Sequence, residues 1–314
     1  MPQVRRTPVA TPTCRPCGGV YVNPWVDSRA ARGDGNCALA GGDGPCRTAS
    51  IGRMDPAIRY IDLLKRCVGN FVYADDGDLL HAPKERLADG RFQATTSVPI
   101  KAEDRRLGRV WPARAHTMIG LVRLENLQAC VETVLRDGVP GDLIETGAWR
   151  GGACILMRGI LAAHGVRDRV VWVADSFKGL PAGDRAKYPQ ETDLPLEAFA
   201  DLAVSLDVVR GNFARYGLLD EQVRFLEGWF RDTLPTAPID KLAVLRMDGD
   251  LYESTMDALV NLYPKLSPGG FAIIDDWGDF AACEAAVNDY RTKHGITEPI
   301  QVLEGAGAWW RRAG

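Results

Sequence analysis

Long apolar runs are missing from this 314-residue sequence, and so is a large excess of charge of one sign. No stretch reaches the roughly 18 apolar residues that suggest a membrane-spanning helix. Lys and Arg number 38 against 41 Asp and Glu, which gives a formal net charge of −3. We therefore expect neither a nucleic acid nor a membrane as a partner. The first residues also lack the order of basic, apolar and small residues of a secretory signal, so we expect a cytoplasmic protein.

The cysteines do not form the dense set that is typical of small secreted proteins held by disulfides. Four of the eight lie in apolar sequence, where we expect buried, reduced thiols. The four in apolar sequence are Cys67, Cys130, Cys154 and Cys283, and the four near the start are Cys14, Cys17, Cys37 and Cys46. A zinc site is an alternative interpretation of the early four. Their second pair is too widely spaced for a usual zinc ribbon, and no His supports it.

Residues 1–53 differ in composition from the rest of the chain. They are rich in Gly, Pro, Ala and Arg and show no sustained apolar period. Such a segment cannot bury enough apolar surface to offset the entropy lost on ordering, so we predict a disordered N-terminal extension. An alternative is that Met54 is the real start of the protein.

Residues 54–140 are predicted to form an N-terminal helical cap that includes the acceptor side of the molecule. Apolar residues recur at helical spacing over 60–71 and again over 118–135. A polar stretch that contains proline, residues 75–114, separates the two helices. Glycine and proline at 138–141 end the second helix.

Residues 141–314 alternate between short apolar runs and helical stretches, which predicts an α/β fold. We expect strands at 142–145, 170–174, 223–226, 242–247 and 271–274, and helices at 151–164, 194–210, 254–262 and 280–294. Continuous apolar strands that alternate with helices indicate a doubly wound, mostly parallel sheet covered on both faces. Pro268-Gly269-Gly270 predicts a turn, and two late runs near 300–303 and 308–310 predict a closing hairpin.

Two strand ends carry residues suited to a nucleoside cofactor. Glu145, Thr146 and Gly147 open a glycine-rich turn after the first strand, and Asp175 and Ser176 follow the second. A glycine turn lets the backbone approach a ligand closely, and an acid about 30 residues further on can bind a ribose diol. The turn lacks the dinucleotide fingerprint, and the acidic Glu145 would repel a pyrophosphate. S-adenosylmethionine, whose sulfonium and ammonium groups are cationic, is therefore the favoured cofactor.

Two further strand ends carry aspartates. Asp248 follows the fourth strand, and Asp275 and Asp276 follow the fifth. Adjacent parallel strands would bring these carboxylates together, and a ligand set of oxygens alone suits Mg²⁺. A single aspartate at such a position is more often a helix cap than a metal ligand. Aspartates at the ends of two adjacent strands favour a metal site.

A proton acceptor beside a metal would complete a site for the transfer of a methyl group to a hydroxyl group. A bound Mg²⁺ would lower the pKa of an acceptor hydroxyl, and a carboxylate would take its proton. Asp250 is the candidate base because it lies two residues beyond Asp248. Asp248 itself is the competing candidate.

Seven motifs together resemble one known family. They are Tyr60-Ile61-Asp62-Leu63-Leu64-Lys65-Arg66, Ala115-His116-Thr117-Met118-Ile119-Gly120, Gly141-Asp142-Leu143-Ile144-Glu145-Thr146-Gly147, Ala174-Asp175-Ser176-Phe177, Gly228-Trp229-Phe230, Arg246-Met247-Asp248-Gly249-Asp250 and Asp275-Asp276. From Met54 onward the chain resembles the macrocin O-methyltransferases, which methylate deoxysugars of macrolide and aminocoumarin antibiotics. Residues 1–53 fall outside the resemblance.

The resemblance implies a class I methyltransferase fold, which is Rossmann-like, with an S-adenosylmethionine-binding core at 141–314 and a requirement for Mg²⁺. The matching metal positions are Asp248, Asp275 and Asp276, and the matching base is Asp250. The implied cofactor contacts are His116, Thr117, Glu145, Thr146, Gly147, Asp175, Ser176, Gly228 and Trp229. The last two would lie near the adenine, although Trp229 is equally well explained as a core aromatic.

The implied acceptor is a small molecule, a deoxysugar on a glycosylated secondary metabolite. A catechol-type methyltransferase is the main alternative, since it would use the same metal chemistry. A metal-dependent glycosyl- or phosphotransfer enzyme and a non-catalytic binding protein are less favoured, because no phosphate-binding loop is present and the set of acids is complete. A homo-oligomer is also compatible with the N-terminal helices. The loop at 179–196 is long enough to act as a lid.

Overall fold

The computed structural model describes residues 55–73, 84–86, 92–94, 101–191 and 195–314. The predictions for the N-terminal extension, for the start at Met54 and for zinc at Cys14, Cys17, Cys37 and Cys46 lie outside these residues. The division of the chain at 53/54 and 140/141 stays a prediction.

A seven-stranded sheet forms the centre of the described structure, with strands in the order β5-β4-β3-β6-β7-β9-β8. The strands are β3 (Asp142–Thr146), β4 (Val171–Asp175), β5 (Val223–Glu227), β6 (Leu242–Met247), β7 (Leu266–Ile274), β8 (Gln301–Val302) and β9 (Ala308–Arg311). The first five pair in parallel, while β9 pairs antiparallel with β7 and with β8. The predicted strands and the predicted closing hairpin are therefore confirmed, and so is the mostly parallel α/β fold.

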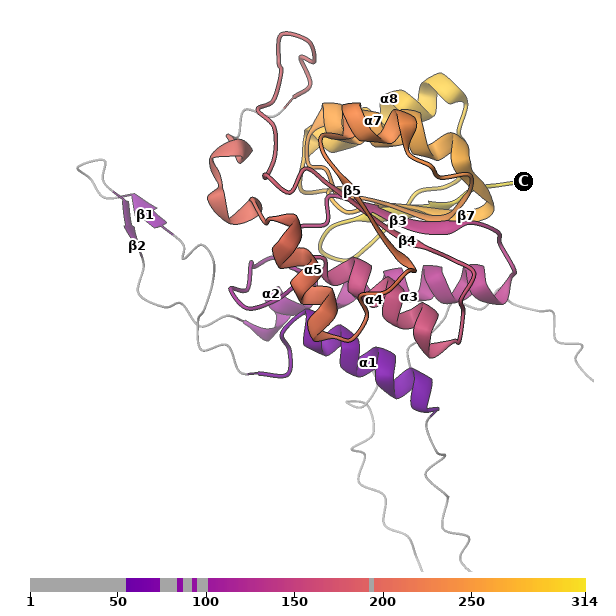
Figure 1. Ribbon diagram of the computed structural model, residues 1–314. Coiled ribbons are helices and arrows are strands. Elements are labelled where there is room, and N and C mark those ends of the chain that lie inside the picture. Colours follow the sequence, from indigo (N-terminus) through magenta and orange to yellow (C-terminus); the bar gives the residue numbers. More distant parts are fainter. Residues whose placement is uncertain (1–54, 74–83, 87–91, 95–100, 192–194) are drawn as a thin grey trace, which may run out of the picture. The chain divides into compact units, whose positions relative to one another are not determined.

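Helices cover both faces of this sheet, as Figure 1 shows. One face carries α3 (Gly120–Arg136), α4 (Gly152–Ala163) and α5 (Leu206–Arg215), and the other carries α7 (Tyr252–Leu262) and α8 (Ala281–His294). The N-terminal helix α1 (Pro56–Val68) packs on α4. The short helices are α2 (Ala102–Leu107) and α6 (Phe230–Thr233), and β1 (Lys84–Arg86) and β2 (Phe92–Ala94) pair antiparallel. Within the described ranges, no helix is both long and apolar enough to cross a bilayer.

Alternate residues of the buried strands face the two helical layers, which explains why the strands read as continuous apolar runs. On β3, Leu143 packs with the cluster that includes α3 and α4, while Ile144 packs with the cluster that includes α7 and α8. On β4, Val173 and Trp172 divide in the same way. Each fully buried side chain of this kind contributes about 1.5–3 kcal/mol, so the position of the strand ends is strongly fixed.

Three local predictions need correction. The predicted turn at 268–270 lies within β7, where Gly269 has φ +83° and its N–H bonds the carbonyl of Arg312 at 2.8 Å. The bend is thus an irregularity in the pairing of β7 with β6, not a turn. The helix predicted over 194–210 begins only at Leu206, after two 3₁₀ turns that follow Pro195. Helix α2 lies within residues 75–114, which we predicted to be a polar stretch between two helices.

The C-terminal hairpin reaches the end of the sheet that carries the aspartates. Strand β9 lies between β7 and β8, and the turn before it donates the N–H of Gly307 to the carbonyl of Trp277 at 2.7 Å. In the same turn Glu304 pairs with Arg106 of α2 at 2.7 Å. The hairpin therefore joins an N-terminal helix to the segment that follows β7.

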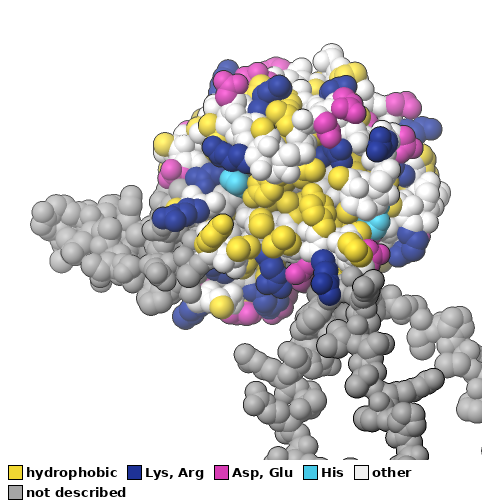
Figure 2. All heavy atoms as spheres, turned by 60° about the horizontal axis from the view of Figure 1, so that its bottom comes forward, with side chains coloured by type: hydrophobic (Ala, Val, Ile, Leu, Met, Phe, Trp, Pro, Cys, Tyr) yellow, Lys and Arg dark blue, Asp and Glu magenta, His cyan; other side chains and the backbone are white. Residues whose placement is uncertain are grey.

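Apolar side chains gather on the face that Figure 2 brings forward, which is the lower face of Figure 1. Ile58 and Leu63 of α1 and Val208 of α5 are each about half exposed. The homo-oligomer stays a prediction, because no described feature shows what covers this face.

Candidate active site

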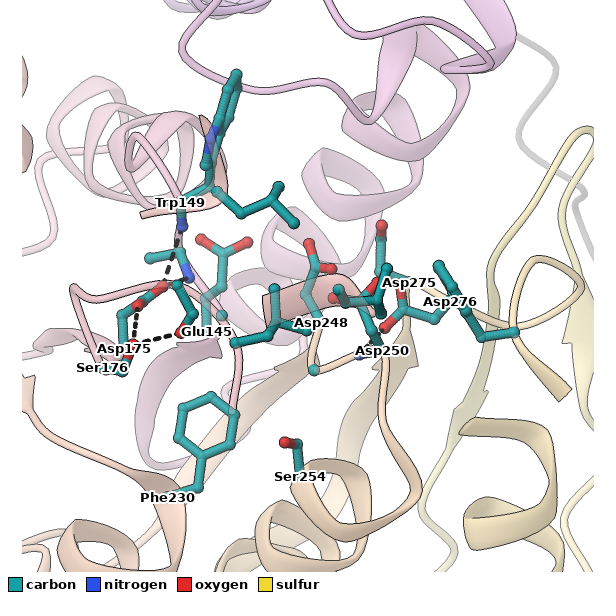
Figure 3. A pocket seen from close by; sticks show the side chains of 18 of the residues that line it. Glu145, Trp149, Asp175, Ser176, Phe230, Asp248, Asp250, Ser254, Asp275 and Asp276 are labelled. Atoms are coloured by element: carbon teal, nitrogen blue, oxygen red, sulfur yellow. Dashed lines mark hydrogen bonds between the residues drawn. The ribbon is translucent and has the colours of Figure 1, made fainter. Parts of the chain in front are cut away.

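A deep cleft lies where the order of the parallel strands reverses. The chain runs outward from β3 to β4 and β5, and then returns to place β6 on the other side of β3. Ligands of doubly wound sheets bind at this reversal, at the carboxyl ends of the strands. The cleft there contains about 1290 Å³ of empty space, counting the part open to solvent. Figure 3 shows it lined in turn by Asp175 and Ser176, by Glu145, and by the aspartates that follow β6 and β7.

The glycine turn after β3 brings two strand ends into contact. Gly147 has φ +91°, and a Cβ atom at this position would lie 1.6 Å from the carbonyl oxygen of Asp248. No side chain fits there, so glycine is required for the close approach of the two chain segments. The N–H of Asp248 also bonds the carbonyl of Thr146 at 2.8 Å. The turn expected to hold a cofactor therefore touches the first of the predicted metal ligands.

Asp175 organises the same turn through its carboxylate. One oxygen accepts the N–H groups of Ala148 (2.7 Å) and Trp149 (3.1 Å), and the other accepts the N–H of Phe177 (2.7 Å). A carboxylate offers about four acceptor positions, and the fourth here meets only the Ser176 hydroxyl at 3.5 Å, so a ligand hydroxyl could take that position. The neighbouring Ser176 lines the cleft, but its hydroxyl donates to the carbonyl of Gly179 at 2.6 Å.

Glu145 lines the cleft but is not an isolated charge. Its carboxylate pairs with Arg246, the residue directly beside it in register on β6, and accepts the thiol hydrogen of Cys154 at 2.8 Å. Burial raises the pKa of Glu145 to about 7, while Arg246 acts in the opposite direction. Arg246 compensates this charge only in part, because the same guanidinium also pairs with Asp248 and Asp275.

The three predicted metal ligands converge. Asp248, Asp275 and Asp276 each offer a carboxylate oxygen, and these atoms lie within 4.8 Å of one another. Burial raises the pKa of Asp248 to about 6, with the charge of Asp275 as the next cause, and burial also raises the pKa of Asp276 well above its usual range. Three close carboxylates, two of them buried, repel one another, so the arrangement favours a cation between them.

Two arginines contact this acidic group. Arg123 of α3 donates to one oxygen of Asp275 at 2.6 Å, and Arg246 pairs with the other oxygen and with Asp248 at 2.8 Å. Glu145, Asp250 and Asp276 belong to the same group, so five carboxylates stand against two guanidinium groups. When all five carboxylates are ionised, the network has a net charge of −3, so it would attract cationic ligands.

Asp250 has an unusual backbone conformation. Its φ is +57°, in the left-handed region, and its N–H bonds a carboxylate oxygen of Asp276 at 2.9 Å. Burial, and then the charge of Asp248, raise the pKa of Asp250 to about 8. Such a conformation costs about 1–3 kcal/mol and persists only where the surroundings enforce it. Here it places the carboxylate in the cleft beside the three converging aspartates (Figure 3).

The other predicted cofactor contacts divide into two groups. Thr117 and Trp229 line the cleft. His116, Thr146 and Gly228 are not part of its lining: the His116 ring bonds the hydroxyl of Tyr216 at 2.8 Å, and the Thr146 hydroxyl is buried without a hydrogen-bond partner among the described residues. Gly228, at φ +141°, bonds the carbonyl of Asp175 and so places Trp229.

The predicted lid, residues 179–196, is attached to the metal side of the cleft in its described part. Gly179, Leu180 and Pro181 line the cleft. Further along, the buried Glu191 accepts the N–H groups of Tyr252 (3.2 Å) and Glu253 (3.3 Å) at the start of α7. Movement of this loop stays a prediction.

Several residues of the site were not identified from the sequence. Arg123 and Arg246 hold the aspartates, and Phe230 and Ser254 form the wall beside Gly249. Arg246 gave a usable signal, since a charged residue inside a continuous apolar strand is rarely buried without partners. Arg123 gave none, because an arginine on an amphipathic helix is ordinarily exposed.

Comparisons with known proteins agree with this geometry. The family model described as Macrocin-O-methyltransferase (TylF) matches residues 57–312. Mycinamicin III 3''-O-methyltransferase of Micromonospora griseorubida is 53% identical over 257 residues, 81% of this chain and 96% of that protein. The 8-demethyl-8-(2,3-dimethoxy-alpha-L-rhamnosyl)-tetracenomycin-C 4'-O-methyltransferase of Streptomyces olivaceus is 55% identical over 254 residues, 80% of this chain and 92% of that protein. The solved structure of the O-methyltransferase NovP is 51% identical, with a TM-score of 0.74, and the match covers 82% of this chain and 100% of that one.

Proposed function

The chain belongs to the macrocin O-methyltransferase family, and on this premise we propose that it moves the methyl group of S-adenosylmethionine to a sugar hydroxyl of a glycosylated natural product, with Mg²⁺ in the site. The observation that carries the proposal is the convergence of Asp248, Asp275 and Asp276 beside the glycine turn. Asp250 lies next to this group as the proposed base.

The acidic group fits Mg²⁺. The ion binds oxygens at about 2.1 Å in octahedral geometry, so neighbouring ligand atoms lie about 3 Å apart and opposite ones about 4.2 Å apart. The three carboxylate oxygens, within 4.8 Å of one another, need only small shifts to reach these values. Asp248 has the freedom for such a shift, since its side chain is 24% exposed. Water and the acceptor would supply the remaining ligands.

The opposite half of the cleft fits a nucleoside cofactor. Asp175 offers an acceptor for a ribose hydroxyl, and Trp229 offers a flat apolar surface for an adenine ring. Glu145 lies between them and the aspartates, where it would meet the amino end of the cofactor. The cleft is continuous from Asp175 to the aspartates, so a cofactor on one side would lie next to an acceptor on the other.

When bound, Mg²⁺ would acidify an acceptor hydroxyl and favour the ionised form of Asp250, and S-adenosylmethionine would supply the methyl group. The chain's own residues then position the reacting atoms and move one proton. Asp250 accepts the hydroxyl proton, and its enforced backbone keeps the carboxylate beside the cation site. Arg123 and Arg246 hold Asp275 in place, each through one of its two carboxylate oxygens.

The names of the relatives support a sugar acceptor. The enzyme of Micromonospora griseorubida acts on mycinamicin III, and that of Streptomyces olivaceus acts on a rhamnosyl group of a tetracenomycin. The acceptor of this chain is proposed on that similarity. No described feature of the cleft favours an aromatic diol over a sugar.

The test is methyl transfer from labelled S-adenosylmethionine to a panel of glycosylated metabolites, their aglycones and a simple catechol, with and without EDTA. We expect label only in a glycosylated acceptor and loss of transfer in EDTA that added Mg²⁺ restores. Asp232→Asn is the matched control, because this carboxylate is 65% exposed and lies outside the cleft lining. Transfer to the catechol alone would replace the sugar acceptor, and full activity in EDTA would refute the role of Mg²⁺.

A further inference from the structure

Arg246 is the most completely buried charged residue at the site. It lies on β6, and its side chain is 1% exposed. A buried guanidinium costs several kcal/mol of solvation unless its hydrogen-bond donors are satisfied. The proposed reaction does not use Arg246 as a ligand or as a base, so its retention in the strand needs another explanation.

The contacts of Arg246 span both halves of the cleft. One terminal nitrogen, Nη1, pairs with Glu145 on the cofactor side and with Asp248 on the metal side, the latter at 2.8 Å. The second nitrogen, Nη2, pairs with Asp275. One planar group therefore touches a residue of the proposed cofactor site and two of the three proposed metal ligands.

The surrounding backbone keeps these partners within reach of one side chain. Glu145 and Arg246 are direct neighbours in the β3–β6 register, and Arg246 is opposite Ile273 near the end of β7. The N–H of Asp248 bonds the carbonyl of Thr146 at 2.8 Å, which holds the two strand ends together. Among the described residues, no other side chain pairs with both Glu145 and the aspartates.

We propose that Arg246 is a positioning residue that makes binding of the cofactor and of the divalent cation cooperative. This inference rests on the proposed function. A cation that draws Asp248 and Asp275 together fixes the plane of the guanidinium, and the fixed guanidinium in turn orients Glu145. The second ligand then meets an ordered partner and loses less conformational entropy on binding, which gives positive cooperativity. The effect is reciprocal by thermodynamic necessity.

If the two sites were separate, a metal ligand could be changed without effect on cofactor binding. The contacts of Arg246 argue against that separation. A guanidinium has donors in a rigid fork, whereas a lysine ammonium is a compact point charge that cannot bridge three carboxylates in the same way. Substitution by lysine therefore separates the role of the fork from the role of the positive charge.

The first experiment uses the unaltered protein and isothermal titration calorimetry. S-adenosylhomocysteine is titrated with and without Mg²⁺, and Mg²⁺ is titrated with and without S-adenosylhomocysteine. This probe lacks the sulfonium charge, so direct repulsion between the ligands is small. We expect each ligand to bind about fivefold tighter, or more, in the presence of the other, with the same factor in both directions.

The second experiment compares Arg246→Lys with Arg158→Lys. Arg158 is a matched control, since it is also buried, at 9% exposure, and pairs with Asp220 away from the cleft. We expect the cooperativity factor to fall to about one in Arg246→Lys and to stay at the wild-type value in Arg158→Lys. Circular dichroism checks that both variants fold.

Glu145→Gln provides a variant that does not depend on the folding of Arg246→Lys. It removes the charge on the cofactor side and leaves the metal ligands in place, so Mg²⁺ should still bind while cooperativity is lost. Equal affinities with and without the other ligand in the wild-type protein, or full cooperativity in Arg246→Lys, would overturn the inference. Failure of either ligand to bind would overturn the proposed function as well, whereas independent binding of both overturns this inference alone.

Discussion

Replacing Asp250 by asparagine removes the proposed base with little other change. The residue has φ +57°, and asparagine tolerates the left-handed region better than most residues, so the backbone should be preserved. The N–H of residue 250 also keeps its 2.9 Å bond to Asp276, because that donor belongs to the main chain. Asp250→Ala is the comparison, since alanine at positive φ should cost about 1 kcal/mol of stability in addition to the lost carboxylate.

The expected loss in rate follows from the role assigned to this carboxylate. General base catalysis contributes about 10²–10⁴-fold, so kcat of Asp250→Asn should fall by that factor, equivalent to about 3–5 kcal/mol. Because Asp250 is not among the three converging ligands, affinities for Mg²⁺ and for S-adenosylhomocysteine should change less than about threefold. Steady-state kinetics with saturating Mg²⁺ and calorimetry measure the two quantities separately.

The same substitution should change how stability depends on pH in the absence of metal. The pKa of Asp250 is raised to about 8 in the fold, above the roughly 3.9 of an unfolded aspartate. Between these values the folded state binds more protons, so stability falls as the pH rises from about 4 through 8. In EDTA, Asp250→Asn should lose less stability than the wild type over this range.

If Asp250→Asn keeps more than a third of the wild-type kcat, Asp250 is refuted as the base, and Asp248 or water is favoured. Loss of Mg²⁺ binding in this variant would make Asp250 a ligand.

Three further perturbations test separate parts of the structure. Gly147→Ala would place a Cβ atom 1.6 Å from the carbonyl oxygen of Asp248. We expect the free energy of unfolding, measured in urea, to fall by about 2–3 kcal/mol, and Mg²⁺ to bind more weakly. Unchanged Mg²⁺ affinity would contradict the close contact. Burial, and then Arg150 and Arg215, lower the pKa of His116 to about 4, so the unfolded chain binds the extra proton below pH 6.5 and stability falls from there toward pH 4. Replacement by glutamine should reduce the loss in melting temperature between pH 7 and pH 5, and equal losses would count against this account. Glu191→Gln should lower the free energy of unfolding by about 0.5–1 kcal/mol, because it removes a negative charge from the start of α7. Glu197 is exposed, so Glu197→Gln should have no effect on stability. Equal urea midpoints for the two variants would show that the Glu191 charge does not stabilise α7.

Much of the fold could be predicted because the strands are buried on both faces. Residues such as Leu143 and Ile144 face opposite helical layers, so each strand reads as an unbroken apolar run with a clear end. The chemistry then lies at these ends, which is why Asp248, Asp275 and Asp276 could be grouped before any coordinates were known. Their convergence depends only on which strands are neighbours.

The remaining features depend on contacts between distant segments. The pairing of Arg123 with Asp275 joins residues 152 positions apart, and nothing local to α3 signals it. The irregularity at Gly269 follows from its bond to the carbonyl of Arg312, so a local pattern of Pro and Gly could only be interpreted as a turn. Helix α5 begins later than predicted because apolar spacing alone does not separate 3₁₀ turns from a continuous α-helix.

The position of β9 has a consequence for synthesis of the protein. This strand is translated after every other described strand, yet it pairs with β7, the strand that leads into Asp275 and Asp276. During translation β7 therefore presents an unpaired edge, and the acidic end of the cleft lacks its support until residues 308–311 emerge. Nascent chains arrested before residue 308 should consequently bind no divalent cation at this site, even though every aspartate has already been made.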